Sequence, residues 1–255
     1  MRAMDEVLPP DLQKKREKGI DEYLSQGFDF VISHPKILAP FVPGILATLA
    51  YLVYIFKALP SVASLFRPTS EALIFFASKS FIFWSIVVAL FVTISSLIGM
   101  VAIAYYLLKE ADYNKAFKAG LGKLPIALLN LIVLIVLLML PFGVLVFIKS
   151  IALIIIISLL ISILAVPPIF FLPALIVEKS FVVLDVFIIY KNTFRDSIIL
   201  GVLYSLISSA AQSLIPVAGS LLNFLIVLPA FTAVYAMLYE DWKEKDHKAS
   251  EEVVY

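Results

Sequence analysis

Apolar residues gather in six long blocks along the chain, and short polar stretches separate them. Each block holds about 20 residues or more, the length that an α-helix needs to cross a hydrocarbon layer of about 30 Å. Only Lys149-Ser150 divides the third block from the fourth; one helix over both would be about 80 Å long, so two crossings with a tight turn fit better. The predicted spans are Ile37–Phe56, Phe81–Leu108, Leu124–Ile148, Ile151–Val177, Ser197–Val217 and Leu221–Tyr239.

A mixed polar and apolar segment leads into the first, third and fifth predicted spans, at residues 22–46, 112–133 and 182–207. Each segment has an aromatic residue before a short polar break. This repeat predicts three units, each an interfacial amphipathic helix followed by a helical hairpin, in an all-α polytopic membrane protein. In the first unit the apolar residues at helical spacing are Ile20, Tyr23, Leu24, Phe28 and Val31, and the basic residues before them are Lys14, Lys15, Arg16 and Lys18.

The basic residues predict the orientation of the chain. With six spans, 16 of the 20 Lys and Arg residues fall on the side of the N-terminus. Cytoplasmic loops are the ones that carry the excess of Lys and Arg, so we expect both termini in the cytoplasm and the protein in the cell (plasma) membrane. The expected regions are an amphipathic N-terminal segment (1–36), a six-helix membrane domain (37–239) and a charged cytoplasmic tail (240–255).

Composition supports this class and excludes others. The chain is 62% hydrophobic and 15% charged, whereas soluble domains carry about 25% charged residues. Its net charge of +1 gives no bulk attraction to nucleic acid. The chain has no cysteine, which excludes disulfides, thiolate metal sites and cysteine nucleophiles.

Chemistry-bearing residues are scarce in the sequence. No ionisable residue lies in the middle of a predicted span, which argues against a pump or an ion-coupled carrier. The chain has no metalloprotease motif, catalytic triad pattern or glycine-rich phosphate loop. We therefore predict no catalytic residue, no metal site, no cofactor and no enzymatic activity.

The fifth predicted span carries a polar stripe of residues four apart. Small residues at this spacing favour close helix packing. The other interpretation is a polar cavity for lipid or another ligand, because a buried amide needs a hydrogen-bond partner. The candidate ligand-binding residues are Asn130, Ser205, Ser209, Gln212 and Asn223.

Prolines lie in the inner half of the fourth predicted span and within the sixth. They either shape packing or form a hinge, and a bend in the fourth span would aim Glu178 and Lys179 along the membrane surface. The hinge candidates are Pro167, Pro168, Pro173 and Pro229. The candidate interfacial residues are Lys14, Lys15, Arg16, Lys18, Glu178, Lys191 and Arg195.

Two stretches, residues 173–202 and 228–245, share a pattern with a known family. The pattern is a proline-containing helix end with Val177-Glu178, an amphipathic segment with a basic turn, and a final proline followed by Leu238-Tyr239 and Asp241. It resembles a six-helix membrane-domain family found fused to some glycerophosphoryl diester phosphodiesterases, and in stand-alone prokaryotic membrane proteins of unknown function. The resemblance implies the fold and not the phosphodiesterase activity.

These observations predict a non-enzymatic integral membrane protein, associated with lipid or acting as a membrane scaffold. The partners that we expect are membrane lipids and a protein at the cytoplasmic face. The alternative is a transporter or channel for a small neutral or apolar solute, supported by the polar stripe and the prolines.

Overall fold

The computed structural model describes residues 18–58, 70–145, 150–214 and 216–252, which form helices and connecting turns without any strand. The all-α prediction is confirmed for this part of the chain. The helices are α1 (Ile20–Ser33), α2 (Val42–Ala58), α3 (Ser70–Phe76), α4 (Lys79–Leu108), α5 (Tyr113–Leu145), α6 (Ile151–Glu178), α7 (Val183–Asn192), α8 (Phe194–Leu214), α9 (Pro216–Leu222) and α10 (Leu228–Glu252). A 3-10 turn (Pro35–Phe41) precedes α2, and a π-helical turn (Asn223–Val227) precedes α10.

Several of these helices have the length and composition of membrane spans. The described residues hold five such helices and one shorter apolar helix, Ile163–Glu178, in the second half of α6. A helical multi-pass membrane protein is thereby supported. The five are Pro35–Ala58, Lys79–Leu108, Tyr113–Pro141, Phe194–Ser213 and Ala218–Asp246.

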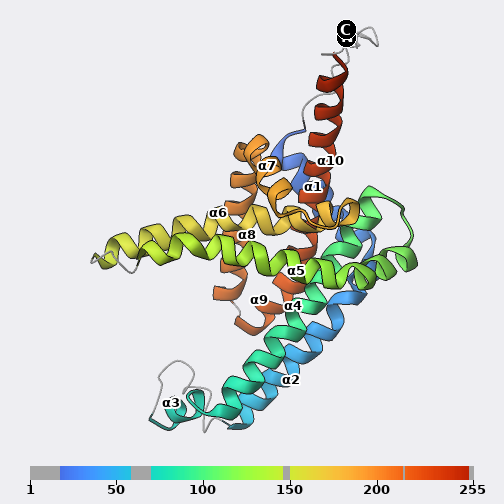
Figure 1. The fold of residues 1–255 in the computed structure, drawn as a ribbon. Helices are drawn as coiled ribbons and strands as arrows, with labels where there is room; N and C mark the ends of the chain where they lie inside the picture. The colour runs from blue at the N-terminus through green and yellow to red at the C-terminus, as the bar shows by residue number, and fades with distance from the viewer. Residues whose placement is uncertain (1–17, 59–69, 146–149, 215, 253–255) are drawn as a thin grey trace, which may run out of the picture.

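The helices form arms that extend from a common body (Figure 1). One arm consists of α2 and α4 side by side, with the short α3 at its tip. A second arm consists of α5 and α6, and it points in a different direction. A third pair forms where α8 leads through α9 and the π-helical turn into α10.

Helix α10 lies at the centre of the body. In its first half Ala230, Phe231, Ala233, Val234 and Tyr235 are all fully buried, so the helix is enclosed on every side. A helix that is apolar around its whole circumference is stable only when it is surrounded. Helices α1, α4 and α6 surround it, and α10 therefore connects parts of the chain that are far apart in sequence.

The three predicted interfacial helices are found in three different forms. The first is α1, but its Tyr23 and Val31 are buried and Phe28 meets Phe231 edge to face, so much of its apolar face contacts protein instead of lipid. The second is not a separate helix, because α5 continues through Gly122 into the predicted span. The third is α7, a separate helix before α8.

The prolines of α6 lie in packed positions. Pro167, Pro168, Pro173 and also Pro229 of α10 are buried, and α6 stays helical through its three prolines. A proline cannot donate a backbone hydrogen bond. Pro167 instead packs against Gly201 of α8, where an added Cβ would lie 3.3 Å from the proline ring. This contact agrees with the packing interpretation of Pro167.

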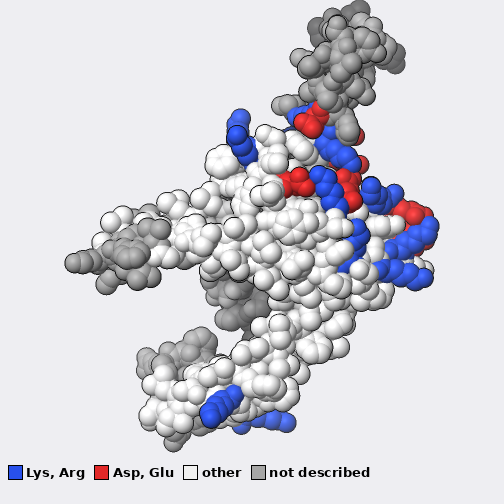
Figure 2. Space-filling view, in the orientation of Figure 1, with Lys and Arg blue, Asp and Glu red and all other residues white. Residues whose placement is uncertain are grey.

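Charged residues are concentrated at one end of the molecule. Figure 2 shows acidic and basic side chains around α7, the second half of α10 and the turn between α4 and α5, whereas the arms are nearly free of them in this view. Basic side chains appear again near the far tip of the α2–α4 arm, where Lys57 lies in the last turn of α2 and Lys79 begins α4. We call the first region the charged end.

Candidate functional site

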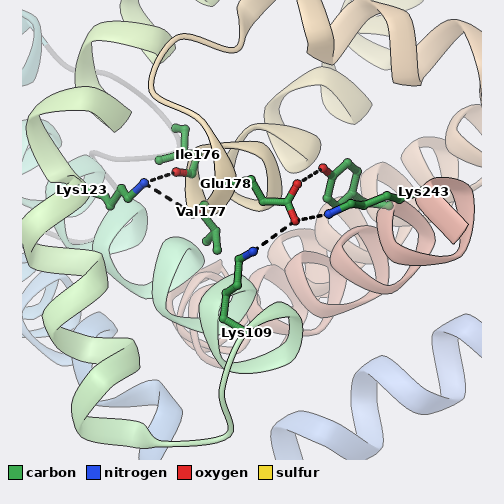
Figure 3. A network of polar contacts seen from close by, with 7 residues as sticks. Lys109, Lys123, Ile176, Val177, Glu178 and Lys243 are labelled. Atoms are coloured by element: carbon green, nitrogen blue, oxygen red, sulfur yellow. Dashed lines mark hydrogen bonds and ion pairs between the residues drawn. The ribbon is translucent and has the colours of Figure 1, made fainter. Parts of the chain in front are cut away.

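Glu178 connects three helices at the charged end. It is the last residue of α6, and its carboxylate accepts hydrogen bonds from Lys243 Nζ at 2.5 Å and Tyr239 Oη at 2.7 Å, both on α10. Lys109 Nζ, just after α4, lies 3.5 Å from the same carboxylate (Figure 3). The Glu178 side chain therefore points toward α10 and the end of α4, whereas its direction relative to a membrane surface stays a prediction.

The surroundings of Glu178 keep it ionised. Burial disfavours the charged carboxylate, but hydrogen bonds from Lys243 and Tyr239 and the charges of Lys243 and Lys109 outweigh burial. The pKa of Glu178 is consequently held below its usual value. The site thus has a fixed negative charge between two cations.

Two further side chains bind the end of α6. Lys123 Nζ on α5 donates to the carbonyl oxygen of Ile176 at 2.8 Å (Figure 3), which satisfies a carbonyl that the helix end leaves open. Asn130, about two turns further along α5, donates to Ser180 O at 2.8 Å and accepts from Val182 N at 2.9 Å. Asn130 is fully buried and holds the α6–α7 connection; its place among the ligand-binding candidates is not supported.

A polar pocket of about 530 Å³ opens at the charged end. It lies between the start of α1, the α7–α8 junction and the second half of α10. Its charged lining residues come from segments far apart in the sequence, and an indole and a phenol add aromatic surface. The lining residues used below are Lys18, Tyr23, Arg195, Asp196, Asp241, Trp242 and Lys245.

One wall of this pocket is held by paired groups. Asp241 accepts a hydrogen bond from Tyr23 Oη at 2.6 Å and forms an ion pair with Lys18 Nζ at 3.1 Å. Burial, followed by the hydrogen bond to Asp241, raises the pKa of Tyr23, so the phenol stays neutral and acts as a donor. Asp241 thereby ties the beginning of the described chain to α10.

Two charged groups of the pocket, Arg195 and Asp196, are uncommitted. Arg195 and Asp196 form no ion pair or hydrogen bond with any residue that the structure describes, and both line the pocket. Lys245 contributes a second cation to the lining. An anion and a cation could therefore be recognised here at the same time.

A second, apolar pocket of about 250 Å³ lies where the three helix pairs meet. Its walls come from α4, α5, α6 and α8 and from the first residue of α10. Ser96 and Thr93 are polar, but Ser96 Oγ is already bonded to the carbonyl of Val92 at 2.8 Å. The pocket contains no ionisable residue other than Tyr204, and its remaining lining residues are Val92, Leu97, Met100, Leu131, Val166, Ile169, Phe170, Leu172 and Leu228.

The predicted polar stripe does not form one cavity. Ser205 bonds to the carbonyl of Gly201 in its own helix, Ser209 is exposed, and Gln212 is exposed and donates to Ser208. Asn223 differs, because its buried Oδ1 has no hydrogen-bond partner among the described residues. It comes from the π-helical turn, far along the chain from Asn130, and the two amides serve different parts of the fold.

The remaining interfacial candidates divide between three locations. Lys14, Lys15 and Arg16 lie outside the described residues. Lys18 and Arg195 reach the polar pocket, whereas Lys191 is exposed and does not line it. The sequence pattern did not single out Tyr23 and Trp242 as pocket residues. Trp242 directly follows Asp241, which belongs to the family pattern, and this position was the one indication in the sequence.

Helical membrane proteins form the class that the fold defines. Comparisons of the chain with known protein families, with curated proteins and with solved structures found no match. The resemblance to the six-helix family of phosphodiesterase-linked membrane domains therefore stays a prediction. The function has to be argued from the two pockets and from the distribution of charge.

Proposed function

We propose that this protein is a non-enzymatic integral membrane protein that holds a lipid between three transmembrane hairpins. The hairpins would be α2–α4, α5–α6 and α8–α10, and α6, with 28 residues, is long enough to serve as the sixth span. Most Lys and Arg residues would then lie on one side, with both termini in the cytoplasm of the cell. The charged end would form the cytoplasmic face.

The observation that carries this proposal is the apolar pocket of about 250 Å³. All three hairpins contribute to it, and its lining is almost wholly aliphatic and aromatic. A cavity of this kind has few polar partners for water and suits a hydrocarbon chain. The lipid would therefore stabilise the arrangement of the hairpins where they meet.

Helix α7 supports contact with the bilayer surface. Val183, Val186 and Ile189 are buried against the protein, whereas Leu184 and Ile188, on the other side, are 71% and 54% exposed. A short helix with an outward apolar face beside a charged region is typical of the membrane interface. We expect this face to enter the headgroup layer.

Filling the apolar pocket tests the proposal. Ser96→Phe places a ring where the lipid chain would lie, whereas Leu90→Phe changes an outward residue of the same helix that is 57% exposed. Native mass spectrometry of gently extracted protein should find one lipid per chain in the native protein and in Leu90→Phe, and none in Ser96→Phe. Bulk lipid at non-integral ratios in all three would contradict the proposal.

A second candidate function is a transporter or channel for a small neutral or apolar solute. The buried oxygen of Asn223, which has no hydrogen-bond partner among the described residues, favours it. Tyr204 of α8 lies beside this amide, so polar groups are available within the predicted membrane region. A small retained solute in the same spectra, lost on Asn223→Leu and kept in Ser96→Phe, would favour that function over lipid binding.

A further inference from the structure

The polar pocket at the charged end combines features that no single structural role explains. Its volume of about 530 Å³ lies in the usual range of small-molecule sites. Asp241, Lys18 and Tyr23 satisfy one another on one wall. Arg195 and Asp196, at the start of α8, remain without partners among the described residues.

From this lining we infer that the pocket binds a phosphate group that carries an amine, as in the zwitterionic headgroup of a phospholipid. The inference rests on the proposed function, in that a lipid headgroup is the source we assign. The shared chemistry, an amine-bearing phosphodiester, also occurs in soluble molecules, and the test separates the two.

Arg195 is the group that would bind the phosphate. A guanidinium presents several N–H donors in a planar fork that matches two phosphate oxygens. Arg195 is exposed, so it can reach a ligand without giving up an existing ion pair within the described chain. Lys245 adds positive charge to the same lining.

Asp196 explains why the ligand should also carry a cation. A bare phosphate beside Asp196 would meet a like charge, which is unfavourable in a partly enclosed pocket. An ammonium group would be attracted by the carboxylate and by the face of the Trp242 indole, which lines the pocket. The Tyr23 ring already has Lys18 Nζ 5.5 Å from its centroid. The mixture of charges thus fits a zwitterion better than a simple anion.

The position of the pocket suits a lipid. Phe194, directly before Arg195, is 52% exposed, and the outward apolar residues of α7 precede it. Hydrocarbon chains leaving the headgroup could follow this surface into the bilayer. A headgroup would therefore be held at the level where α7 is expected to lie.

Trp242 provides a direct readout. The chain has two tryptophans, Trp84 and Trp242, so Trp84→Phe leaves Trp242 as the one indole. This full-length variant, in a phosphate-free maltoside detergent, is titrated with glycerophosphoethanolamine while the emission of Trp242 is followed. We expect a saturable change; a flat titration would overturn the inference.

Charge variants decide whether the recognition is specific. Arg195→Gln should weaken binding of glycerophosphoethanolamine about 10- to 100-fold, because a charge-assisted hydrogen bond contributes about 1.5–3 kcal/mol. The matched control Lys191→Gln removes the same charge four residues earlier, outside the pocket, and should leave the affinity unchanged. Equal losses in both variants would mean diffuse attraction and would overturn the assignment.

Further probes test the amine and the source of the ligand. Asp196→Asn should weaken binding of glycerophosphoethanolamine and not that of inorganic phosphate; equal effects would overturn the role of the amine.

Dihexanoyl phosphatidylethanolamine, kept below its micelle concentration, should bind more tightly than glycerophosphoethanolamine. Equal affinities would overturn the lipid assignment in favour of a soluble phosphodiester.

The outcome is separable from that of the proposed function. Lipid retained in the mass spectra together with a flat Trp242 titration would refute this pocket and leave the apolar one. A saturable titration without any retained lipid would refute lipid binding between the hairpins and leave the phosphodiester site.

Discussion

Glu178 illustrates how single polar residues organise the charged end. Its carboxylate meets Tyr239, Lys243 and Lys109, so one side chain links α6 to α10 and to the end of α4. Its side chain is 16% exposed, while those of the two lysines are 40% and 45% exposed. The lysines can stay hydrated, whereas the carboxylate depends on its protein partners.

Replacing this carboxylate should lower stability. Glu178→Gln leaves two lysines without their shared anion and should cost about 1.5–3 kcal/mol, the usual range for a hydrogen bond to a charged group. Thermal unfolding in detergent at pH 7 measures the loss. Asp185→Asn is the control, because Asp185 pairs with the 57% exposed Lys179 and should change the midpoint little.

The difference between native protein and Glu178→Gln should also depend on pH. The pKa of Glu178 is lowered in the folded state, so its stabilisation is fully present above the usual value of 4.5 and is lost as pH falls through the folded pKa. The two midpoints should therefore converge in acid. A gap that stays constant down to pH 3 would show that the carboxylate charge contributes nothing.

At the scale of elements, small residues set how closely helices approach. An added Cβ at Gly27 of α1 would lie 2.8 Å from the backbone oxygen of Ala230 on α10, a rigid neighbour. At Gly99 of α4 it would meet the ring of the fully buried Phe41. Close packing of this kind replaces the hydrophobic driving force that lipid-exposed helices lack.

Two Gly→Ala substitutions should have opposite effects. Gly27→Ala should destabilise the protein by about 1–3 kcal/mol, because α1 must move away from α10. Gly122→Ala should be neutral or stabilise it by up to about 1 kcal/mol, because Gly122 lies inside α5 and has no atom within 4 Å of the added Cβ. Thermal unfolding of the two variants compares them, and equal destabilisation would contradict the α1–α10 contact.

Element boundaries were one part of the sequence analysis that the structure corrected. The Gly122-Lys123 break suggested a separate interfacial helix, but α5 runs from Tyr113 to Leu145 without interruption. Lys123 is used for another purpose, since it binds the end of α6. A polar residue interrupts the run of apolar side chains in a helix but leaves the backbone hydrogen bonds of the helix intact. The residue that it contacts in the folded protein cannot be read from the sequence.

At the scale of the whole molecule, the apolar arms extend away from one charged end (Figure 1, Figure 2). The ends of α4 and α6, the start of α5 and the second half of α10 meet there. The face that we propose is cytoplasmic is therefore built from segments that are far apart in the sequence. The arms depend on lipid to cover large exposed residues such as Leu140, which is 65% exposed.

The cysteine-free chain allows a direct test of orientation. Ala77 lies just before α4 and Ala111 just after it, and both are exposed. In intact cells a membrane-impermeant maleimide should label Ala77→Cys, while Ala111→Cys should react only after permeabilisation. The reverse pattern would place the charged end outside, and labelling of both would mean that α4 does not cross the membrane.

The sequence by itself determined the class of protein, because long apolar blocks and the scarcity of charge are local, additive properties that need no partner. It also predicted the helices that the structure shows as α1 and α7, and the resemblance to the six-helix family drew attention to Glu178, Tyr239 and Asp241. Tertiary structure alone decided their contacts: Glu178 with Tyr239, Tyr23 with Asp241, and Asn130 with the α6–α7 connection. The polar and apolar pockets are formed by residues more than 100 positions apart, and periodicity along a chain carries no information about which distant faces meet.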